Sequence, residues 1–189
     1  MMRKIAMLAV VLLVGTANAQ QGPRPAAELE RLKPLDGNWT CKGVTPAGAM
    51  GAGSPEFKYN STFTIKPSSN GVAYTIVYDQ KEATPPYSGS WSVAWDGAKK
   101  KLVFFYLDTV GNVGLQTVGD WHGDALVVQG EGYAVPAPSG FVPPALAGKA
   151  IFRDTFTRKG DSNMHWKGEL KLRGMKTWTV IGDDDCTKL

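Results

Sequence analysis

Residues 57–79, FKYNSTFTIKPSSNGVAYTIVYD, are the stretch that decides the fold class. In the first ten residues, apolar and polar side chains alternate, which is the period of a half-buried β-strand. Asn70-Gly71 then makes a tight turn into a second strand-like stretch, 72–79. Two such stretches joined by this turn predict an antiparallel hairpin.

The same pattern continues along most of the chain. Asp96-Gly97, for example, separates an alternating stretch from a shorter one that is apolar on both faces. A helix is expected at 25–33, because a proline begins this segment and Pro34 ends it. The expected strands, about ten in all, cover residues 37–44, 57–66, 72–79, 87–96, 101–109, 113–121, 125–132, 149–158, 163–172 and 176–182.

Successive strands with short turns and no crossover helices predict an antiparallel meander. A meander of this length must close on itself or split into two sheets to hide its edges. We therefore expect an all-β fold, an antiparallel up-and-down barrel of about eight to ten strands with a short N-terminal helix. A two-sheet sandwich is the alternative. An outer-membrane barrel is disfavoured, because the apolar faces carry many large aromatics and several strands are short or broken by glycine.

The N-terminus has the pattern of a secretory signal peptide. Arg3 and Lys4 precede ten apolar residues, and an A-x-A cleavage site ends at Ala19. The apolar stretch is too short to span a membrane as a helix. The expected organisation is a signal peptide (1–19), an N-terminal segment with the short helix (20–34) and the barrel domain (35–189). The mature protein is then secreted or periplasmic and has no stable membrane span.

The charge and cysteine content are consistent with a secreted or periplasmic protein. The chain has 21 basic and 17 acidic residues, and loss of Arg3 and Lys4 with the signal peptide leaves a net charge of +2. The longest basic run is 99–101, so a broad basic surface for nucleic acid is not expected. Cys41 and Cys186 form an isolated pair, which in an oxidising compartment becomes a disulfide. Two free thiols are the alternative.

Residues 35–39, LDGNW, place a G-x-W motif on the first strand directly after the short helix. This opening resembles that of lipocalin-like (calycin-type) secreted β-barrels, and in particular bacterial lipocalin-like domains of unknown function. The resemblance implies that Gly37 and Trp39 close one end of a barrel that holds a small apolar molecule. It also places 45–56 where lipocalins carry a lid loop. A disulfide between the first strand and the C-terminus is similar to those of lipocalins.

Aromatic residues on the apolar strand faces are the candidate ligand contacts. Asp154 lies between two phenylalanines on one face, and burying its charge is costly unless it is paired. It is expected to form an internal ion pair, to turn outward at a bulge, or to anchor a polar group of a ligand. The predicted ligand-binding residues are Trp91, Trp95, Phe104, Tyr106, Asp154 and Trp166.

No G-x-S-x-G, H-E-x-x-H or P-loop motif is present, so we expect no enzyme. The expected function is binding of a small apolar or amphipathic molecule, gated by 45–56 and the uncharged loop 133–148. The alternative is a structural or interaction domain with a filled core that contacts another envelope protein. No cofactor or metal is expected. Haem bound through His165 is a minor alternative, and 183–185 (DDD) is expected to be a solvated tail rather than a calcium loop.

Overall fold

The computed structural model describes residues 26–82, 86–109, 111–134, 148–172 and 174–189. The predicted signal peptide and residues 135–147 of the uncharged loop lie outside these ranges. The strands are β1 (Gly37–Thr45), β2 (Phe57–Pro67), β3 (Ala73–Gln80), β4 (Tyr87–Asp96), β5 (Lys101–Asp108), β6 (Val113–His122), β7 (Ala125–Ala134), β8 (Gly148–Arg158), β9 (Asn163–Leu172) and β10 (Thr179–Lys188).

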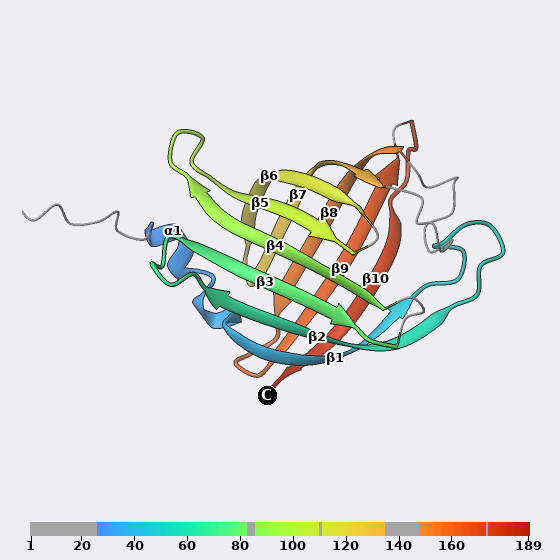
Figure 1. The fold of residues 1–189 in the computed structure, drawn as a ribbon, viewed down its shortest axis with the longest axis horizontal. Helices are drawn as coiled ribbons and strands as arrows, with labels where there is room; N and C mark the ends of the chain where they lie inside the picture. Colours follow the sequence, from blue (N-terminus) through green and yellow to red (C-terminus); the bar gives the residue numbers. More distant parts are fainter. Residues whose placement is uncertain (1–25, 83–85, 110, 135–147, 173) are drawn as a thin grey trace, which may run out of the picture.

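The strands form a closed antiparallel barrel (Figure 1). Each strand pairs with its neighbours in the chain, and β1 pairs with β10 to complete the circle. Closure leaves no free sheet edge, which is the physical reason a meander of this length closes. The predicted up-and-down barrel is confirmed, and the two-sheet sandwich is wrong.

Alternation of polar and apolar residues sets which side chains enter the barrel. Along β2, Tyr59, Ser61, Phe63 and Ile65 are buried, and the residues between them face outward. The turn after β2 uses Gly71 at φ 68°, a conformation that glycine adopts without steric cost. Because the side-chain period is two, the register of each strand is fixed by its buried face.

A short helical segment covers one end of the barrel, called the helix end below. It consists of α1 (Ala27–Glu30) and a 3-10 turn (Lys33–Leu35), which is less helix than the predicted 25–33. Pro34 lies inside the 3-10 turn instead of ending a longer helix, and no side chain caps α1. Within the described ranges, no helix is long and apolar enough to cross a membrane.

The helix end is closed by apolar side chains. Leu29, Leu32 and Leu35 are buried against the core, and Trp39 is fully buried. The indole Nε1 of Trp39 donates a hydrogen bond to the carbonyl of Leu35 at 2.9 Å. The connection 46–56 lies at the opposite end of the barrel, called the loop end below (Figure 1).

The last strand differs from the prediction. It covers Thr179–Lys188 rather than 176–182, so residues 183–185 lie in the barrel wall and the expected solvated tail is wrong. In β10, Cys186 is the register partner of Cys41 in β1. The two cysteines form the predicted disulfide, which is confirmed.

Candidate functional site

The helix half of the barrel interior is filled with apolar side chains. Phe63, Phe104 and Phe156 are 0% exposed, and the aliphatic residues around them are almost as deeply buried. The ring centroids of Phe63 and Phe156 are 6.1 Å apart with the rings edge to face, a favourable aromatic geometry. This half is a packed core.

The loop half of the interior has a different composition. Its inward-facing residues include tyrosines, acids, amides and several glycines. Examples are Tyr59 in β2, Asp184 in β10, Tyr106 in β5 and Gln116 in β6. Several keep residual exposure: Phe152, Asp154 and Trp166 are 7% exposed and Tyr106 is 6% exposed. These residues are buried, although slightly less completely than the phenylalanines of the helix half.

Asp154 lies at the centre of this half, in β8. Its carboxylate accepts a hydrogen bond from Gln116 Nε2 in β6 and one of 3.1 Å from Trp166 Nε1 in β9. Burial raises the pKa of Asp154 from 3.8 to about 6, although the N–H groups of Gln116, Trp166 and Trp91 act in the opposite direction. Desolvation is therefore the dominant influence on this carboxyl.

Two buried polar atoms beside Asp154 have no hydrogen-bond partner. They are Trp91 Nε1 and Gln116 Oε1, and their residues are 3% and 1% exposed. Buried polar groups are nearly always paired, so each such exception needs an explanation. Trp91 Nε1 lies near the carboxylate and lowers its pKa, so Gln116 Oε1 is the acceptor that a donor on a ligand would satisfy.

Four aromatic rings contact one another in series, include the Trp166 ring that donates to Asp154, and are called the aromatic box: Trp91, Tyr106, Phe152 and Trp166. The ring centroids of Trp91 and Tyr106 are 5.0 Å apart, those of Tyr106 and Phe152 are 6.2 Å apart, and those of Trp91 and Trp166 are 6.5 Å apart. The box combines apolar ring faces with a buried acid.

Glycines hold one ring of the box against the wall. Gly168 and Gly182 are register partners in β9 and β10, and a Cβ at either would lie 2.7 Å from the Trp166 ring. Any larger residue at these positions would push the indole away from the wall. The glycine pair therefore fixes where the Trp166 ring lies.

A second buried acid, Asp184, lies on β10 beside the box. Its carboxylate accepts hydrogen bonds from Tyr59 at 2.7 Å and from Ser61. Burial raises the pKa of Asp184, and it also raises the pKa of Tyr59 far above its ordinary value. Both carboxylate oxygens have a protein partner, so Asp184 is held in place by the wall.

The box borders a tyrosine pair at the loop end. Tyr106 and Tyr87 share a hydrogen bond between their hydroxyls, and Tyr106 donates to Asp108 Oδ2 at 2.6 Å. The side-chain amide of Asn112 donates to the same oxygen at 2.6 Å. Burial raises the pKa of both tyrosines, so they remain neutral hydrogen-bonding phenols near pH 7.

The structure brings together four of the predicted ligand-binding residues: Trp91, Tyr106, Asp154 and Trp166. The other two lie elsewhere. Phe104 belongs to the packed helix half, and Trp95 lines a separate pocket of about 240 Å³ at the helix end. Asp154 forms neither the expected ion pair nor an outward bulge, because Arg153 points outward and pairs with Glu169 at 2.7 Å.

The remaining candidates lie away from the aromatic box. His165 contacts Asp185 at 3.0 Å and Asp183 at 3.4 Å, both of which face outward, so its ring does not reach the barrel interior. No group of three or more potential metal ligands occurs within the ranges that the structure covers. Gly37 and Trp39 lie at the helix end, where Gly37 has φ 132°.

Sequence reasoning missed Gln116 and Asp184 as interior residues. Gln116 lies in a glycine-broken stretch, and its partner Asp154 is 38 positions away. Asp184 is one of three consecutive aspartates, of which the strand period turns only the middle one inward. Continuing the strand alternation to the C-terminus would have predicted that Asp184 faces inward.

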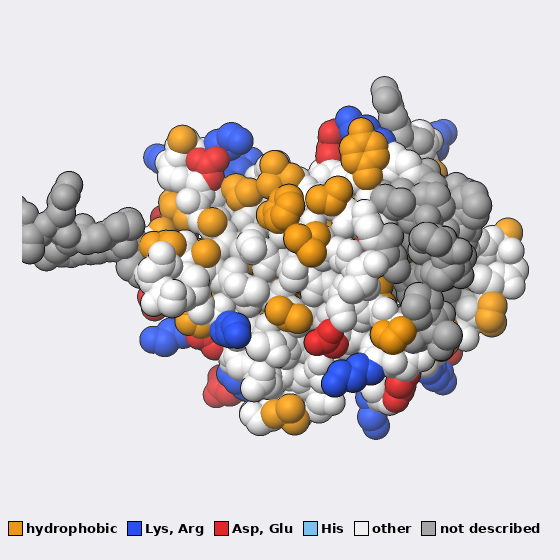
Figure 2. All heavy atoms as spheres, in the orientation of Figure 1, with side chains coloured by type: hydrophobic (Ala, Val, Ile, Leu, Met, Phe, Trp, Pro, Cys, Tyr) orange, Lys and Arg blue, Asp and Glu red, His pale blue; other side chains and the backbone are white. Residues whose placement is uncertain are grey.

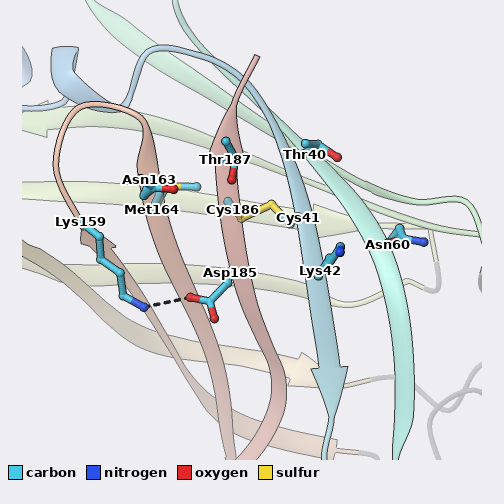
Figure 3. Close-up of a pocket in the computed structure, with 10 residues that line it drawn as sticks. All are labelled: Thr40, Cys41, Lys42, Asn60, Lys159, Asn163, Met164, Asp185, Cys186 and Thr187. Atoms are coloured by element: carbon cyan, nitrogen blue, oxygen red, sulfur yellow. Dashed lines mark hydrogen bonds and ion pairs between the residues drawn. A yellow bond between two sulfur atoms is a disulfide. The ribbon is translucent and has the colours of Figure 1, made fainter.

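An outer pocket of about 580 Å³ lies along the β1–β10 pair, beside the disulfide (Figure 3). Lys159 lines this pocket, and its ammonium group contacts the carboxylate of Asp185 at 2.9 Å. The other lining side chains are mostly short and polar, and the disulfide sulfurs belong to buried residues. This pocket has neither the aromatic faces nor the unpaired buried atoms of the box.

No family model matches the chain, and no curated protein sequence matches it significantly. Fourteen chains of solved structures do match in fold. One is the crystal structure of Rv2717c from M. tuberculosis, with a TM-score of 0.62 and 12% identity. The match covers 87% of this chain and 99% of that one. At this identity, the likeness shows that the two chains share the barrel fold and nothing more.

Proposed function

We propose that this protein is an exported, lipocalin-like binding protein that holds a small apolar or amphipathic molecule in the loop half of its barrel. The observation that carries the proposal is the aromatic box with its two unpaired buried atoms, Trp91 Nε1 and Gln116 Oε1. Each unpaired buried polar atom costs about 1–3 kcal/mol. A ligand donor that pairs with Gln116 Oε1 would remove the cost of that atom.

The division of the interior supports the same proposal. The packed helix half supplies stability, while the loop half keeps polar groups and residual exposure around Asp154. Binding sites in proteins combine apolar walls with a few convergent polar groups. The box matches this composition, and an apolar ligand body would lie against its rings.

Native mass spectrometry of the mature protein, purified from its own host, tests the proposal directly. We expect a small molecule to be retained and to be released on unfolding. A variant of Gly114 supplies the control, because a Cβ there meets neighbouring atoms only at 3.6 Å or more. Gly114→Ala should fold and retain the molecule.

Gly114→Leu should instead lose the molecule, because its larger side chain extends toward Phe152. Ser92→Val, on the exposed outer face of β4, is the matched control for added volume. Retention that is equal in all of these variants would exclude the loop half as the binding site. A wild-type protein that is empty and also fails to take up added hydrophobic dyes would contradict binding altogether.

An interaction function is the second candidate, and one observation favours it. Figure 2 shows apolar side chains gathered on the outer wall over β5 and β6. Exposed residues that are register partners make up this patch: Phe105 with Leu115, Leu107 with Val113, and Val113 with Tyr133. Chemical cross-linking in the host tests it, because Leu115→Asp should abolish any cross-linked envelope protein and leave ligand retention unchanged.

A further inference from the structure

The interior of the barrel contains buried acids without buried bases. Across the described residues, the buried charged side chains are Asp154, Glu169 and Asp184. Glu169 lies on the outer wall, where Arg153 contacts it at 2.7 Å and Lys167 at 3.4 Å. Asp154 and Asp184 face inward and have only neutral hydrogen-bond donors.

This imbalance determines which ligand charge the box accepts. An anionic ligand, such as a fatty acid, would add a second negative charge beside Asp154 in a region of low dielectric constant. A cation would supply the countercharge that the protein itself does not provide. The electrostatics of the interior therefore favour a ligand with a positive charge.

The hydrogen-bonding groups beside Asp154 indicate which kind of cationic group fits there. Gln116 donates to Asp154 through Nε2, which leaves its Oε1 as an unpaired acceptor beside the carboxylate. A carboxylate has about four acceptor sites, and Gln116 and Trp166 occupy two of them. An ammonium group carries three donors and would pair with the carboxylate and with Oε1 together.

The rings of the aromatic box add a second attraction for a cation. The faces of tryptophan, tyrosine and phenylalanine attract ammonium groups within about 6 Å of the ring centroid. The centroids of Trp91 and Tyr106 are 5.0 Å apart with 32° between the ring planes, so these two rings pack on each other, and a cation would meet the face of one ring rather than lie between the two. Trp91 Nε1 lies near the same carboxylate and favours its ionised form, which is the form that pairs with a cation.

We propose that the ligand enters the aromatic box with a protonated primary amine, whose ammonium group pairs with Asp154 and with Gln116 Oε1 while its apolar body lies against the rings. This inference rests on the proposed function and names the chemical class of its ligand. Asp154 is the recognition group, and Trp91 and Trp166 are the ring contacts.

Titration calorimetry with matched probes tests the inference. One series is 2-phenylethylamine, 2-phenylethanol and phenylacetate; a second is decylamine, decanol and decanoate. Measured near pH 8, each series keeps the body and changes only the end group. We expect the amine of at least one series to bind at least about tenfold more tightly than its alcohol, as a charge-assisted hydrogen bond implies. The acids should not bind.

Asp154→Asn is the matching variant, because asparagine keeps the shape of the side chain and loses its charge. It should weaken amine binding about tenfold or more and change alcohol binding by less than about twofold. Asp161→Asn removes the same charge from an exposed turn at the helix end and should change neither. Circular dichroism confirms that both variants are folded.

The outcomes separate the two proposals. If alcohols or acids bind as tightly as amines, or if Asp154→Asn leaves amine binding intact, the amine inference is wrong while small-molecule binding stands. If no probe of either series binds and the native protein is also empty, the proposed function itself is contradicted.

Discussion

Replacing Asp154 by asparagine is expected to stabilise the folded protein at neutral pH. Burial raises the pKa of this carboxyl from 3.8 to about 6, so the folded state binds the proton more tightly than the unfolded state. Above about pH 6, folding therefore has to keep an unfavourable charge buried. Below about pH 4, the carboxyl is neutral in both states, and this cost disappears.

The difference of about two pKa units corresponds to about 3 kcal/mol. Asparagine resembles the protonated carboxyl, and the Gln116 amide can rotate to accept from it while Trp166 still donates. Asp154→Asn should therefore be up to about 3 kcal/mol more stable than the wild type near pH 7.5 and equally stable near pH 4. The gain shrinks as pH falls through about 6.

Urea unfolding of both proteins at several pH values measures this difference. The difference in unfolding free energy between the two proteins is the quantity to compare. Groups that titrate in the same way in both proteins do not contribute to it, such as Asp96 and Asp185, whose pKa values are lowered by hydrogen bonds. Stability curves that run parallel from pH 7.5 to 4 would refute the argument. So would an Asp154→Asn protein that is less stable at neutral pH. A gain in stability from losing Asp154 would mark it as a residue retained for a purpose other than folding.

Two further changes probe the wall. Gly182→Ala should lower the free energy of unfolding by about 1–3 kcal/mol in urea titrations, because its Cβ would lie 2.7 Å from the Trp166 ring. Gly114→Ala has room for its Cβ and should lower the free energy of unfolding by less. Equal losses in the two variants would contradict the close contact at Gly182. Replacing both Cys41 and Cys186 by alanine should cost at most about 5 kcal/mol, the chain-entropy value for a closed loop of 145 residues. An unchanged urea midpoint would contradict that estimate.

Local patterning was sufficient to predict most of the fold. β4 and β9 begin and end at the predicted residues, 87–96 and 163–172, because period-two alternation and flanking turn residues are local signals. Closure into a barrel followed from the number of strands and the need to hide edges. The helix was overestimated, because the proline that ends an α-helix is also accepted within a 3-10 turn.

The site was only partly predictable, because its pairings are long-range. Asp154 was identified from its apolar neighbours, but its partner Gln116 is 38 positions away. Three consecutive aspartates indicate solvent exposure. Asp184 is nevertheless buried, because Tyr59 and Ser61, 125 and 123 positions away, donate to its carboxylate. No local pattern contains that information.

The β1–β10 pair is the seam of the barrel, and it differs from every other strand pair. All the others join strands that are consecutive in the chain, whereas the seam brings together the first and last strands of the barrel. Its loop-closure entropy is therefore the largest in the fold, and contacts of this kind form slowly. Until the seam closes, β1 and β10 are open edges that can pair with other chains. The bond between Cys41 and Cys186 joins register partners, so once it forms the seam becomes as local as a hairpin. Formation of the disulfide therefore converts the pairing with the longest sequence separation into one of the shortest. Refolding of the reduced protein is expected to be the condition under which the barrel aggregates.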